Sequence, residues 1–325
     1  MLDIYKSIEK KASSERTVHE LIKVDEIQDD TWIHLHAPSE EEIELISEKL
    51  DVPQEFLRYP LDDEERPRVD IDEDNGDMLI IVDIPCNIHD DQPNLYWTVP
   101  LGIIITKRQL ITVSLREVPI LDVFIHNQAK DFQVNYRNRF AIQILLHAAK
   151  DYLRFLRFID KTIESSGRQL ARSTTNRELY RLLELSKSLV YFSTSLKSNE
   201  AVLERLMRGN TLRQYAEDEE LLDDTIIEFK QAKEMADIYT SVVNTTMDAY
   251  ASIINNNMNE VMKIMAAATI ALSVPTIISS FFGQNCPMPW DAEFSSHPIP
   301  FFILVLAGTI SIGCAIWVLR KHRML

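Results

Sequence analysis

Hydroxyl side chains recur at helical spacing in an otherwise apolar stretch near the end of the chain. The stretch runs from Ile264 to Phe282 without a charged residue, and its hydroxyls follow one another at steps of four, three and four. They belong to Thr269, Ser273, Thr276 and Ser280. This spacing places them on one face of a helix. In a membrane such a face lines a water-filled path, joins two helices by hydrogen bonds, or bonds its hydroxyls to the backbone of its own helix, and the stripe alone leaves these interpretations open.

Amide and thioether side chains continue the pattern on both sides of this stretch. Four asparagines crowd its start, at positions 255, 256, 257 and 259. Met262 and Met265 follow, one turn apart, as a candidate hydrophobic constriction that closes a pore by dewetting. The tripeptide Gly283-Gln284-Asn285 stands directly after the stretch, at its exit from the membrane.

Other candidate chemistry is weaker. His34 and His36 place two imidazoles on one side of a predicted strand, as a metal site requires, but the sequence shows no third ligand, which favours a half-exposed strand face. Cys86, Cys286 and Cys314 have no metal-ligand spacing and are interpreted as packing residues. The sequence has no glycine-rich phosphate loop, no Gly-x-Ser-x-Gly elbow and no His-Glu-x-x-His helix, so no enzyme and no organic cofactor are predicted.

Two segments are long and apolar enough to cross a bilayer. These are residues 264–282 and 299–319, and at about 1.5 Å per helical residue each covers a hydrocarbon core of about 30 Å. The first residues contain no apolar signal segment, which predicts a cytoplasmic N-terminal part. The basic residues after the second span, Arg320, Lys321 and Arg323, place the C-terminus on the same side. The sequence therefore predicts a multi-pass protein of the cell membrane with both termini cytoplasmic.

The rest of the chain is strongly acidic. The formal net charge is −16, and residues 264–325 carry three basic and two acidic side chains, which leaves about −17 for the predicted cytoplasmic part. A nucleic-acid-binding protein would show the opposite balance, so nucleic acid is excluded as a partner.

Proline placement divides the predicted cytoplasmic part into two regions. Eight prolines fall between Pro38 and Pro119, and none occurs from Ile120 to Val274, which predicts a mixed α/β region followed by helices. Strands are predicted at 31–35, 78–82, 95–99, 102–106 and 110–113, and helices at 40–50, 140–166 and 176–208. Ser39 and Glu42 form a capping box before the first helix.

A single helix of about 60 residues is predicted from Asp223 to Phe282, because neither glycine nor proline interrupts the run before the membrane. Its seam of apolar and small residues repeats at steps of four and three, which requires a partner helix. The seam comprises Ala232, Ala236, Tyr239, Val243, Thr246, Tyr250, Ile253 and Asn257. Packing on helices of the same subunit and packing between subunits are equally compatible with it.

Four features of the last part of the chain occur in a fixed order: the segment Asn256-Asn257-Met258-Asn259-Glu260-Val261-Met262-Lys263, the polar-striped span, the tripeptide and the basic tail. Together they resemble the CorA family of divalent cation (Mg²⁺/Co²⁺) channels. The resemblance covers the chain. Two further segments carry it: residues 65–85, similar to the family's N-terminal αβα domain, and residues 221–236, similar to its stalk entry. It implies an α+β membrane protein, a funnel-shaped homopentamer whose stalk helix continues into the first of two transmembrane helices.

The resemblance also implies the division of the chain and its site. The expected parts are an α/β domain (1–135), a helical region (136–222), a stalk (223–263), a pore-lining span (264–282), an external loop (283–298), a second span (299–319) and a basic tail (320–325). The pore face carried over is Asn259, Met262, Met265, Thr269, Ser273, Thr276 and Ser280. Gly283, Gln284 and Asn285 are the expected selectivity filter, with the Asn285 amide and the Gly283 carbonyl contacting a hydrated ion.

Gln284 departs from the family signature, which is Gly-Met-Asn. Branches of the superfamily that move Zn²⁺ also vary this position, so two functions remain open. One is influx of Mg²⁺ or Co²⁺. The other is transport of Zn²⁺, Ni²⁺ or Co²⁺, with proton coupling or outward flux. A membrane-anchored coiled-coil sensor is the alternative from another class, but a tether needs neither the signature nor the polar stripe.

Regulation is expected to use the acidic surface. In the family, Mg²⁺ between subunits screens carboxylates and holds the pore closed, so Mg²⁺ is expected as both transported and regulatory ion. Acidic clusters occur at 62–65, 70–74 and 217–224. Solvated surface charge explains most individual carboxylates equally well, so no sensor residue is assigned.

Overall fold

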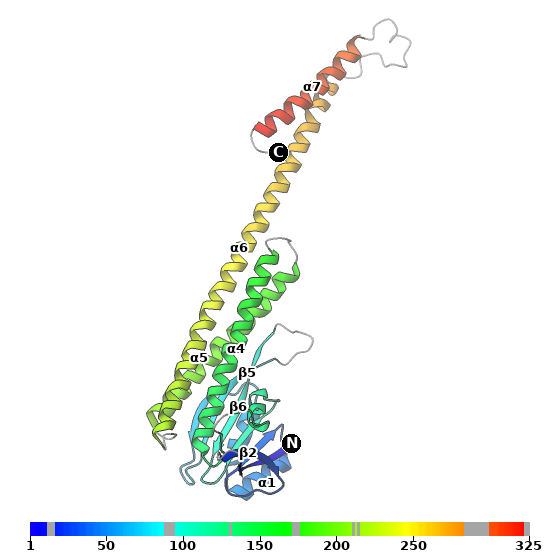
Figure 1. The fold of residues 1–325 in the computed structure, drawn as a ribbon. Helices are drawn as coiled ribbons and strands as arrows, with labels where there is room; N and C mark the ends of the chain where they lie inside the picture. The colour runs from blue at the N-terminus through cyan, green and yellow to red at the C-terminus, as the bar shows by residue number, and fades with distance from the viewer. Residues whose placement is uncertain are drawn as a thin grey trace. The chain divides into compact units, whose positions relative to one another are not determined.

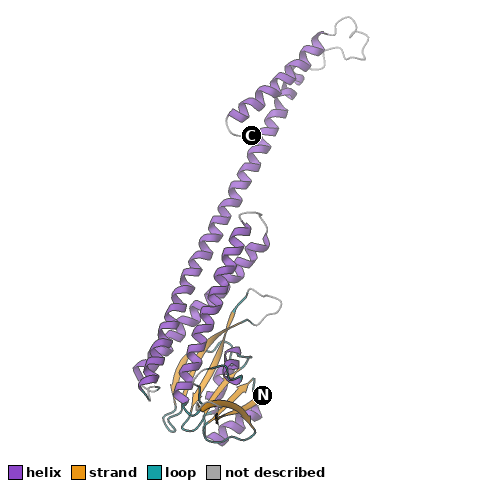
Figure 2. Cartoon of the chain, viewed as in Figure 1, coloured by secondary structure: helices purple, strands orange, loops and turns teal. Residues whose placement is uncertain are grey.

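The computed structural model describes residues 1–11, 17–87, 95–129, 132–170, 176–209, 212, 215–282 and 299–321. The chain forms two compact units, Met1–Met247 and Asp248–Leu325, called here the N-terminal and the C-terminal unit. Figures 1 and 2 show strands and shorter helices in the first unit and helix alone in the described part of the second.

A seven-stranded sheet forms the base of the N-terminal unit, in the order β2-β1-β3-β7-β6-β5-β4. Neighbouring strands are antiparallel except β3 and β7. The strands are β1 (Leu2–Lys11), β2 (Thr17–Val24), β3 (Thr31–His36), β4 (Arg68–Ile71), β5 (Met78–Cys86), β6 (Trp97–Ile105) and β7 (Leu110–Ser114).

Helices cover both faces of this sheet. On one face, α1 (Glu40–Leu50) and α2 (Gln54–Arg58) with the 3₁₀ turn Tyr59–Leu61 close a core in which Ile33, Leu79 and Ile111 are fully buried. On the other face lie α3 (Pro119–Ile125), α4 (Arg137–Leu170) and α5 (Asn176–Gly209), and the Trp32 ring meets Phe140 edge-on at 5.1 Å. The arrangement is the expected αβα sandwich.

Local sequence signals explain several element boundaries. The predicted capping box of α1 is confirmed, since Glu42 N–H donates to Ser39 Oγ at 3.2 Å and Ser39 N–H donates to Glu42 Oε2 at 2.9 Å. The runs predicted at 95–99 and 102–106 form one strand, β6. Pro100 and Gly102 interrupt the run of strand-favouring residues, but the strand continues through them. β1, β2 and β4 were not predicted, since their many charged residues hide the alternation.

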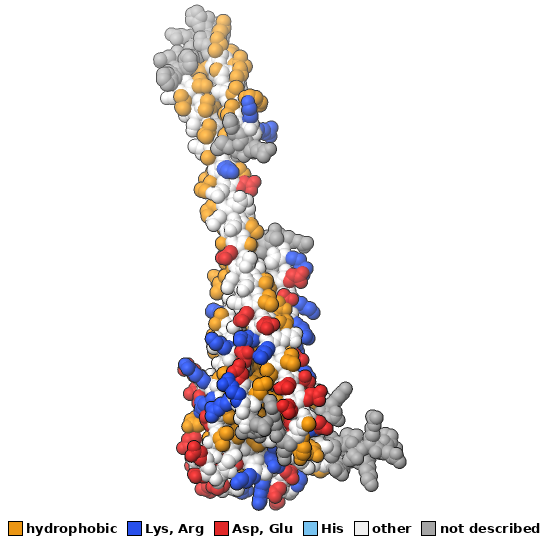
Figure 3. Space-filling view, turned by 90° about the vertical axis from the view of Figure 1, so that its left-hand side faces the viewer, with side chains coloured by type: hydrophobic (Ala, Val, Ile, Leu, Met, Phe, Trp, Pro, Cys, Tyr) orange, Lys and Arg blue, Asp and Glu red, His pale blue; other side chains and the backbone are white. Residues whose placement is uncertain are grey.

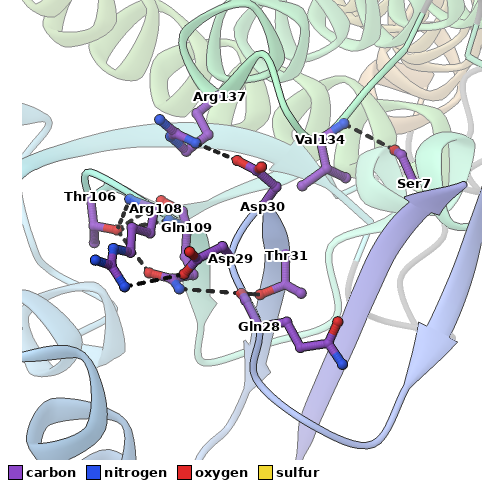
Figure 4. Close-up of polar contacts among 10 residues, drawn as sticks. All are labelled: Ser7, Gln28, Asp29, Asp30, Thr31, Thr106, Arg108, Gln109, Val134 and Arg137. Atoms are coloured by element: carbon purple, nitrogen blue, oxygen red, sulfur yellow. Dashed lines mark hydrogen bonds and ion pairs between the residues drawn. The ribbon is translucent and has the colours of Figure 1, made fainter.

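The beginning of α4 is fastened to the sheet by a polar cluster in the turn before β3 (Figure 4). Arg137 Nη1 donates to Asp30 Oδ1 at 2.7 Å, and Asp30 holds a left-handed backbone with φ of 58°. Beside it, Gln109 Nε2 donates to the Gln28 carbonyl at 3.2 Å. These bonds join the turns that precede β3 and β7 to the first turn of the long helix.

One helix, α6 (Ala216–Phe282), contributes residues to both units. It begins seven residues before the predicted start, because Asp218 caps it by accepting from Tyr215 N–H at 3.1 Å and from Arg139 Nε at 2.8 Å. The predicted boundaries between helical region, stalk and first span stay predictions, since α6 runs through them without a break. The second helix of the C-terminal unit is α7 (Ile299–Lys321).

The predicted seam of α6 packs within the chain along the N-terminal unit. Ala232, Ala236 and Val243 are buried there. Lys233 Nζ donates to Glu200 Oε2 of α5 at 2.6 Å, and a Cβ added at Gly167 of α4 would lie 3.8 Å from Thr246 Cγ2. Of the two interpretations of the seam, packing on helices of the same subunit holds as far as Thr246.

A buried polar network joins β5 to α4 and α5. The Asp83 carbonyl accepts from Tyr152 Oη at 3.0 Å and from Asn199 Nδ2 at 2.7 Å, while the Asp83 carboxylate accepts from Ser195 Oγ at 2.6 Å. Burial raises the pKa of Asp83 to about 6, because the single hydroxyl only partly replaces lost water.

Replacing Asp83 with asparagine is expected to stabilise the protein at pH 7.5 by about 2 kcal/mol. The folded-state pKa lies above the unfolded value, so the carboxylate costs stability once ionised, and this cost grows as pH rises from about 4 to about 6. Thermal unfolding of the detergent-solubilised protein at pH 7.5 and 4.5 checks this, with a clearly larger gain expected at the higher pH. The exposed Asp29→Asn is the control, and an equal gain at both pH values would contradict the assignment.

Candidate functional site

Two described helices contain a stretch that is long and apolar enough to cross a membrane. The first belongs to α6 and ends at Ile278, and the second is Phe301–Lys321 of α7. Acidic and basic side chains mix over the surface of the N-terminal unit, whereas mainly hydrophobic side chains cover the helices of the C-terminal unit (Figure 3). At the end of α7, the Lys321 ammonium lies 5.2 Å over the Trp317 ring. An aromatic ring beside a basic residue is typical of a helix end at the membrane interface.

All seven predicted pore-lining residues lie on α6, and all are exposed within the single chain. At about 100° per residue, those from Met262 to Ser280 fall within about 80° of the helix circumference, and Asn259 lies about 40° beyond it. Met262 is 54% exposed and Met265 is 65% exposed. This sector, defined by these seven residues, is called the polar stripe below.

The opposite side of α6 is the sheltered one. Ala267 is fully buried, and the partly buried positions of the span lie within about 100° of one another, on the side of the helix roughly opposite the polar stripe. They are Ala271, Val274, Pro275 and Ile278. The two faces of this helix thus differ in solvent exposure as well as in residue type.

The helix α7 provides the shelter. Figure 1 shows it running beside the last part of α6 within the C-terminal unit. Its own sheltered positions repeat at steps of three and four: Phe301, Leu304, Ala307, Gly308, Ser311, Ala315 and Leu319. A Cβ added at Gly308 would meet nothing within 4 Å, so the shelter does not depend on a close approach of the two helices at this glycine. The polar stripe therefore faces away from α7.

The hydroxyls of the stripe are satisfied by their own helix. Thr269 Oγ1 donates to the Met265 carbonyl at 2.9 Å, Ser273 Oγ donates to the Thr269 carbonyl at 2.7 Å, and Thr276 Oγ1 donates to the Leu272 carbonyl at 2.9 Å. None of these three bonds involves α7. Of the interpretations of the stripe, these bonds match the one in which the hydroxyls are satisfied by their own helix backbone.

The predicted selectivity filter, Gly283, Gln284 and Asn285, lies outside the described residues. The external loop that follows it and the last four residues of the basic tail lie outside them as well. The assignment of the filter therefore stays a prediction from the sequence.

The acidic clusters of the N-terminal unit have local partners. Asp63 pairs with Arg116 at 2.7 Å, which lowers the pKa of the Asp63 carboxyl by hydrogen bonding. Asp218 and Glu217 each bind Arg139 at 2.8 Å. Within the described part of the chain, no group of three His, Cys, Asp or Glu side chains could hold a metal ion.

The sequence shows no third ligand beside His34 and His36, but the sheet places acidic residues near them. Asp3 of β1 is the register partner of His34, and Asp122 lies in the first turn of α3 near the same cavity. Only the pairing of β1 with β3 reveals this, and β1 had no recognisable strand pattern.

Comparisons with known proteins agree on one family. The family model described as CorA-like Mg²⁺ transporter protein matches residues 28–321. A cobalt/magnesium transport protein CorA from Methanocaldococcus jannaschii is 27% identical over 294 residues, which is 89% of this chain and 90% of that protein.

Solved structures match over the same range. The complete structure of the CorA magnesium transporter from M. jannaschii matches with a TM-score of 0.78 and 25% identity, covering 99% of this chain and 98% of that one. The ZntB cytoplasmic domain from Vibrio parahaemolyticus matches with a TM-score of 0.61 at 14% identity, covering 78% of this chain and 98% of that domain. The second match indicates a shared fold only.

Proposed function

Because the chain belongs to the family of CorA-like Mg²⁺ transporter proteins, we propose that it is a homopentameric channel for Mg²⁺, and also for Co²⁺, directed into the cytoplasm. Family membership makes it a divalent cation transport protein of the membrane and not an enzyme. The number of subunits, the direction of flux and the gating are the proposed parts.

The observation that carries the proposal is the division of α6 into two opposite faces. One face is occupied by α7, while the polar stripe on the other is exposed in the single chain. The stripe hydroxyls are satisfied by their own helix, but their remaining lone pairs and the exposed Asn259 amide favour water or further subunits over lipid. A ring of subunits with the stripe turned inward meets that preference, and the family resemblance sets the number at five.

In this ring, an ion would pass five copies of each polar-stripe residue between the Asn285 amides and the Asn259 side chains. Mg²⁺ releases its water reluctantly, and neutral amide, hydroxyl and carbonyl oxygens bind its hydration shell without replacing it. The membrane potential drives the ion inward with about 4.6 kcal/mol per 100 mV for a double charge. No proton coupling is needed for such a flux.

Cysteine accessibility tests the orientation of the stripe. Cys86, Cys286 and Cys314 are first replaced, and Thr269→Cys is compared with its neighbour Ile270→Cys, which lies about 100° around the helix. A charged methanethiosulfonate reagent is expected to block Mg²⁺ flux into proteoliposomes by at least tenfold in Thr269→Cys. It should leave Ile270→Cys unchanged. Equal block in both, or in neither, would contradict a pore lined by the stripe.

We further propose that cytoplasmic Mg²⁺ holds the ring closed by screening carboxylates of adjacent subunits. About 17 net negative charges per subunit repel one another when five copies are brought together and the divalent ion is removed. The expected opening is a shift between two assemblies that bind Mg²⁺ with different affinity.

Chelation of Mg²⁺ is therefore expected to loosen the N-terminal units and to accelerate their cleavage by protease several-fold. Limited proteolysis of the purified protein in EDTA and in 10-fold molar excess of Mg²⁺ over EDTA measures this. Matched ionic strength, set with NaCl, controls for general screening. Equal cleavage rates would mean that the acidic clusters are ordinary solvated surface.

A further inference from the structure

A small cavity in the N-terminal unit lies between the end of α1 and two turns of the sheet. Its volume is about 210 Å³, below the roughly 300 to 1,000 Å³ of pockets for drug-sized ligands. The β4–β5 turn contributes Asn75 and Asp77 to its lining, and the β6–β7 turn contributes Thr106, Lys107 and Arg108. Any ligand of this cavity must therefore be small.

Asp77 is buried in this lining without a partner. The residue is 4% exposed, and within the described part of the chain its carboxylate receives no hydrogen bond and forms no ion pair. The side-chain atoms there that are both unpartnered and fully enclosed belong to other residues, so the Asp77 oxygens open onto the cavity. A buried carboxylate without donors is costly, and its donors must therefore come from whatever fills the cavity.

The charges around Asp77 favour a positive donor. Burial raises the pKa of the Asp77 carboxyl, and the nearby charges of Asp72 and Asp51 raise it further, whereas Lys107 lowers it. A positive group placed in the cavity would offset both the burial and the repulsion between carboxylates.

The β6–β7 turn does not supply this donor from its hydroxyl group. Met78 lies opposite Ile105, so Asp77, directly before β5, lies beside Thr106, directly after β6. The Thr106 hydroxyl is engaged within its own turn, since Oγ1 donates to the Gln109 carbonyl at 3.1 Å and accepts from Gln109 N–H at 2.9 Å (Figure 4).

The Asn75 amide on the other side of the cavity is engaged as well. Its Nδ2 donates to the Asp51 carbonyl at 2.8 Å and to Asp51 Oδ2 at 3.3 Å. Asp51 ends α1 in the left-handed region, with φ of 56°, and these two bonds fasten the β4–β5 turn to that helix end. Because Asp51 is itself exposed and lines the cavity, a ligand meets one buried and one exposed carboxylate.

The basic side chains of the lining are exposed. Arg108 Nη1 lies 3.5 Å from Asp29 Oδ1, while Lys107 forms no ion pair within the described residues. A metal ion does not fit this set, because no group of three His, Cys, Asp or Glu side chains in the described ranges could hold one. The set combines a buried negative charge with an exposed ammonium group, and so complements a molecule that carries both signs.

We propose that this cavity binds a small amino acid in its zwitterionic form, with its ammonium group donating to Asp77 and its carboxylate contacting Lys107. An ammonium group carries three donors, which suits a carboxylate that receives none from the protein. Asp51 is the second acceptor for this group. The site is separate from the proposed pore and does not rest on the proposed transport function.

Calorimetric titration of the full-length protein in detergent tests the proposal with four probes. Glycine and 4-aminobutyrate carry both charges at different spacing, butylamine carries only the positive charge, and butyrate carries only the negative charge. At pH 7.5 and matched ionic strength, one of the two amino acids is expected to bind at least tenfold more tightly than butylamine, and butyrate is expected to bind more weakly still. Binding of neither amino acid, or equal affinity for all four probes, would overturn the proposal.

Asp77→Asn identifies the partner of the ammonium group. This variant is expected to weaken binding of the tighter amino acid at least tenfold while the protein stays folded, because the change removes a buried charge. Asp74→Asn is the matched control, since Asp74 is exposed in the same turn and does not line the cavity. Thermal unfolding without ligand checks the fold of both variants. Parental affinity in Asp77→Asn would show that the ligand does not contact this carboxylate.

Lys107→Gln identifies the partner of the carboxylate. It is expected to weaken binding of the amino acid severalfold and to leave the affinity for butylamine unchanged. If the Lys107 ammonium itself filled the cavity, this variant would bind both the amino acid and butylamine more tightly, and that result would overturn the proposal.

Discussion

Replacing Asn285 with alanine is expected to lower Mg²⁺ uptake by at least 100-fold while the pentamer stays intact. In the proposed filter, the Asn285 amide oxygen accepts hydrogen bonds from water bound to the arriving ion, and alanine removes this acceptor from all five subunits together. A hydrogen bond that involves a charged group contributes roughly 1.5 to 3 kcal/mol. Loss of several such bonds therefore weakens ion capture by orders of magnitude.

Flux of Mg²⁺ into proteoliposomes under an imposed potential measures this effect, and native mass spectrometry checks the assembly. Gln284→Met is the matched variant, since it restores the family signature at the adjacent position. It is expected to keep the flux and to shift selectivity toward Mg²⁺ in a comparison with Co²⁺ and Zn²⁺. Uptake by Asn285→Ala at the parental rate would mean that these residues are not the filter.

Valine in place of Gly102 is expected to prevent stable folding of the N-terminal unit. Gly102 lies in the middle of β6, and a Cβ built there comes 2.9 Å from Pro60 Cβ and still closer to Pro60 Cγ. The proline ring cannot rotate away, and Leu79 on the other side is fully buried. Overpacking of a core typically costs 1 to 3 kcal/mol, and a branched side chain against a rigid ring is expected to exceed about 3 kcal/mol.

Thermal unfolding and the yield of folded protein in detergent report this loss. The control substitution is Gly167→Ala in α4, where an added Cβ meets only Thr246 Cγ2 at an ordinary 3.8 Å. Alanine is favoured over glycine in a helix interior, so this variant should be more stable by roughly 0.5 to 1 kcal/mol. A Gly102→Val protein that unfolds at the parental temperature would show that the Pro60 contact is not restrictive.

Much of the architecture was predictable because its signals are local. The capping box of α1 requires only Ser39 and Glu42, and the continuity of α6 follows from a long run without glycine before Pro275. The polar stripe was visible for the same reason, since residues three and four apart share a helix face. These features depend on neighbours within one or two turns.

Features that depend on distant pairing were not predictable in this way. β1 reads as a mixed charged segment, and its place between β2 and β3 is set by pairing with both. Without that strand, Asp3 has no position relative to His34. The early start of α6 likewise depends on Arg139, which is 79 residues before the Asp218 that it binds. The face of α6 opposite the stripe became identifiable only through its burial beside α7.

The direction of the hydrogen bonds in the polar stripe has a consequence for anions. Thr269, Ser273 and Thr276 each donate their only hydroxyl proton to a carbonyl of their own helix. Only the lone pairs of these hydroxyls would then face a central pore. Water bound to a metal cation can donate hydrogen bonds to lone pairs, whereas chloride or phosphate would be repelled by them. The proposed pathway would thus reject negative ions by the polarity of its hydroxyl groups, without a single carboxylate in the span.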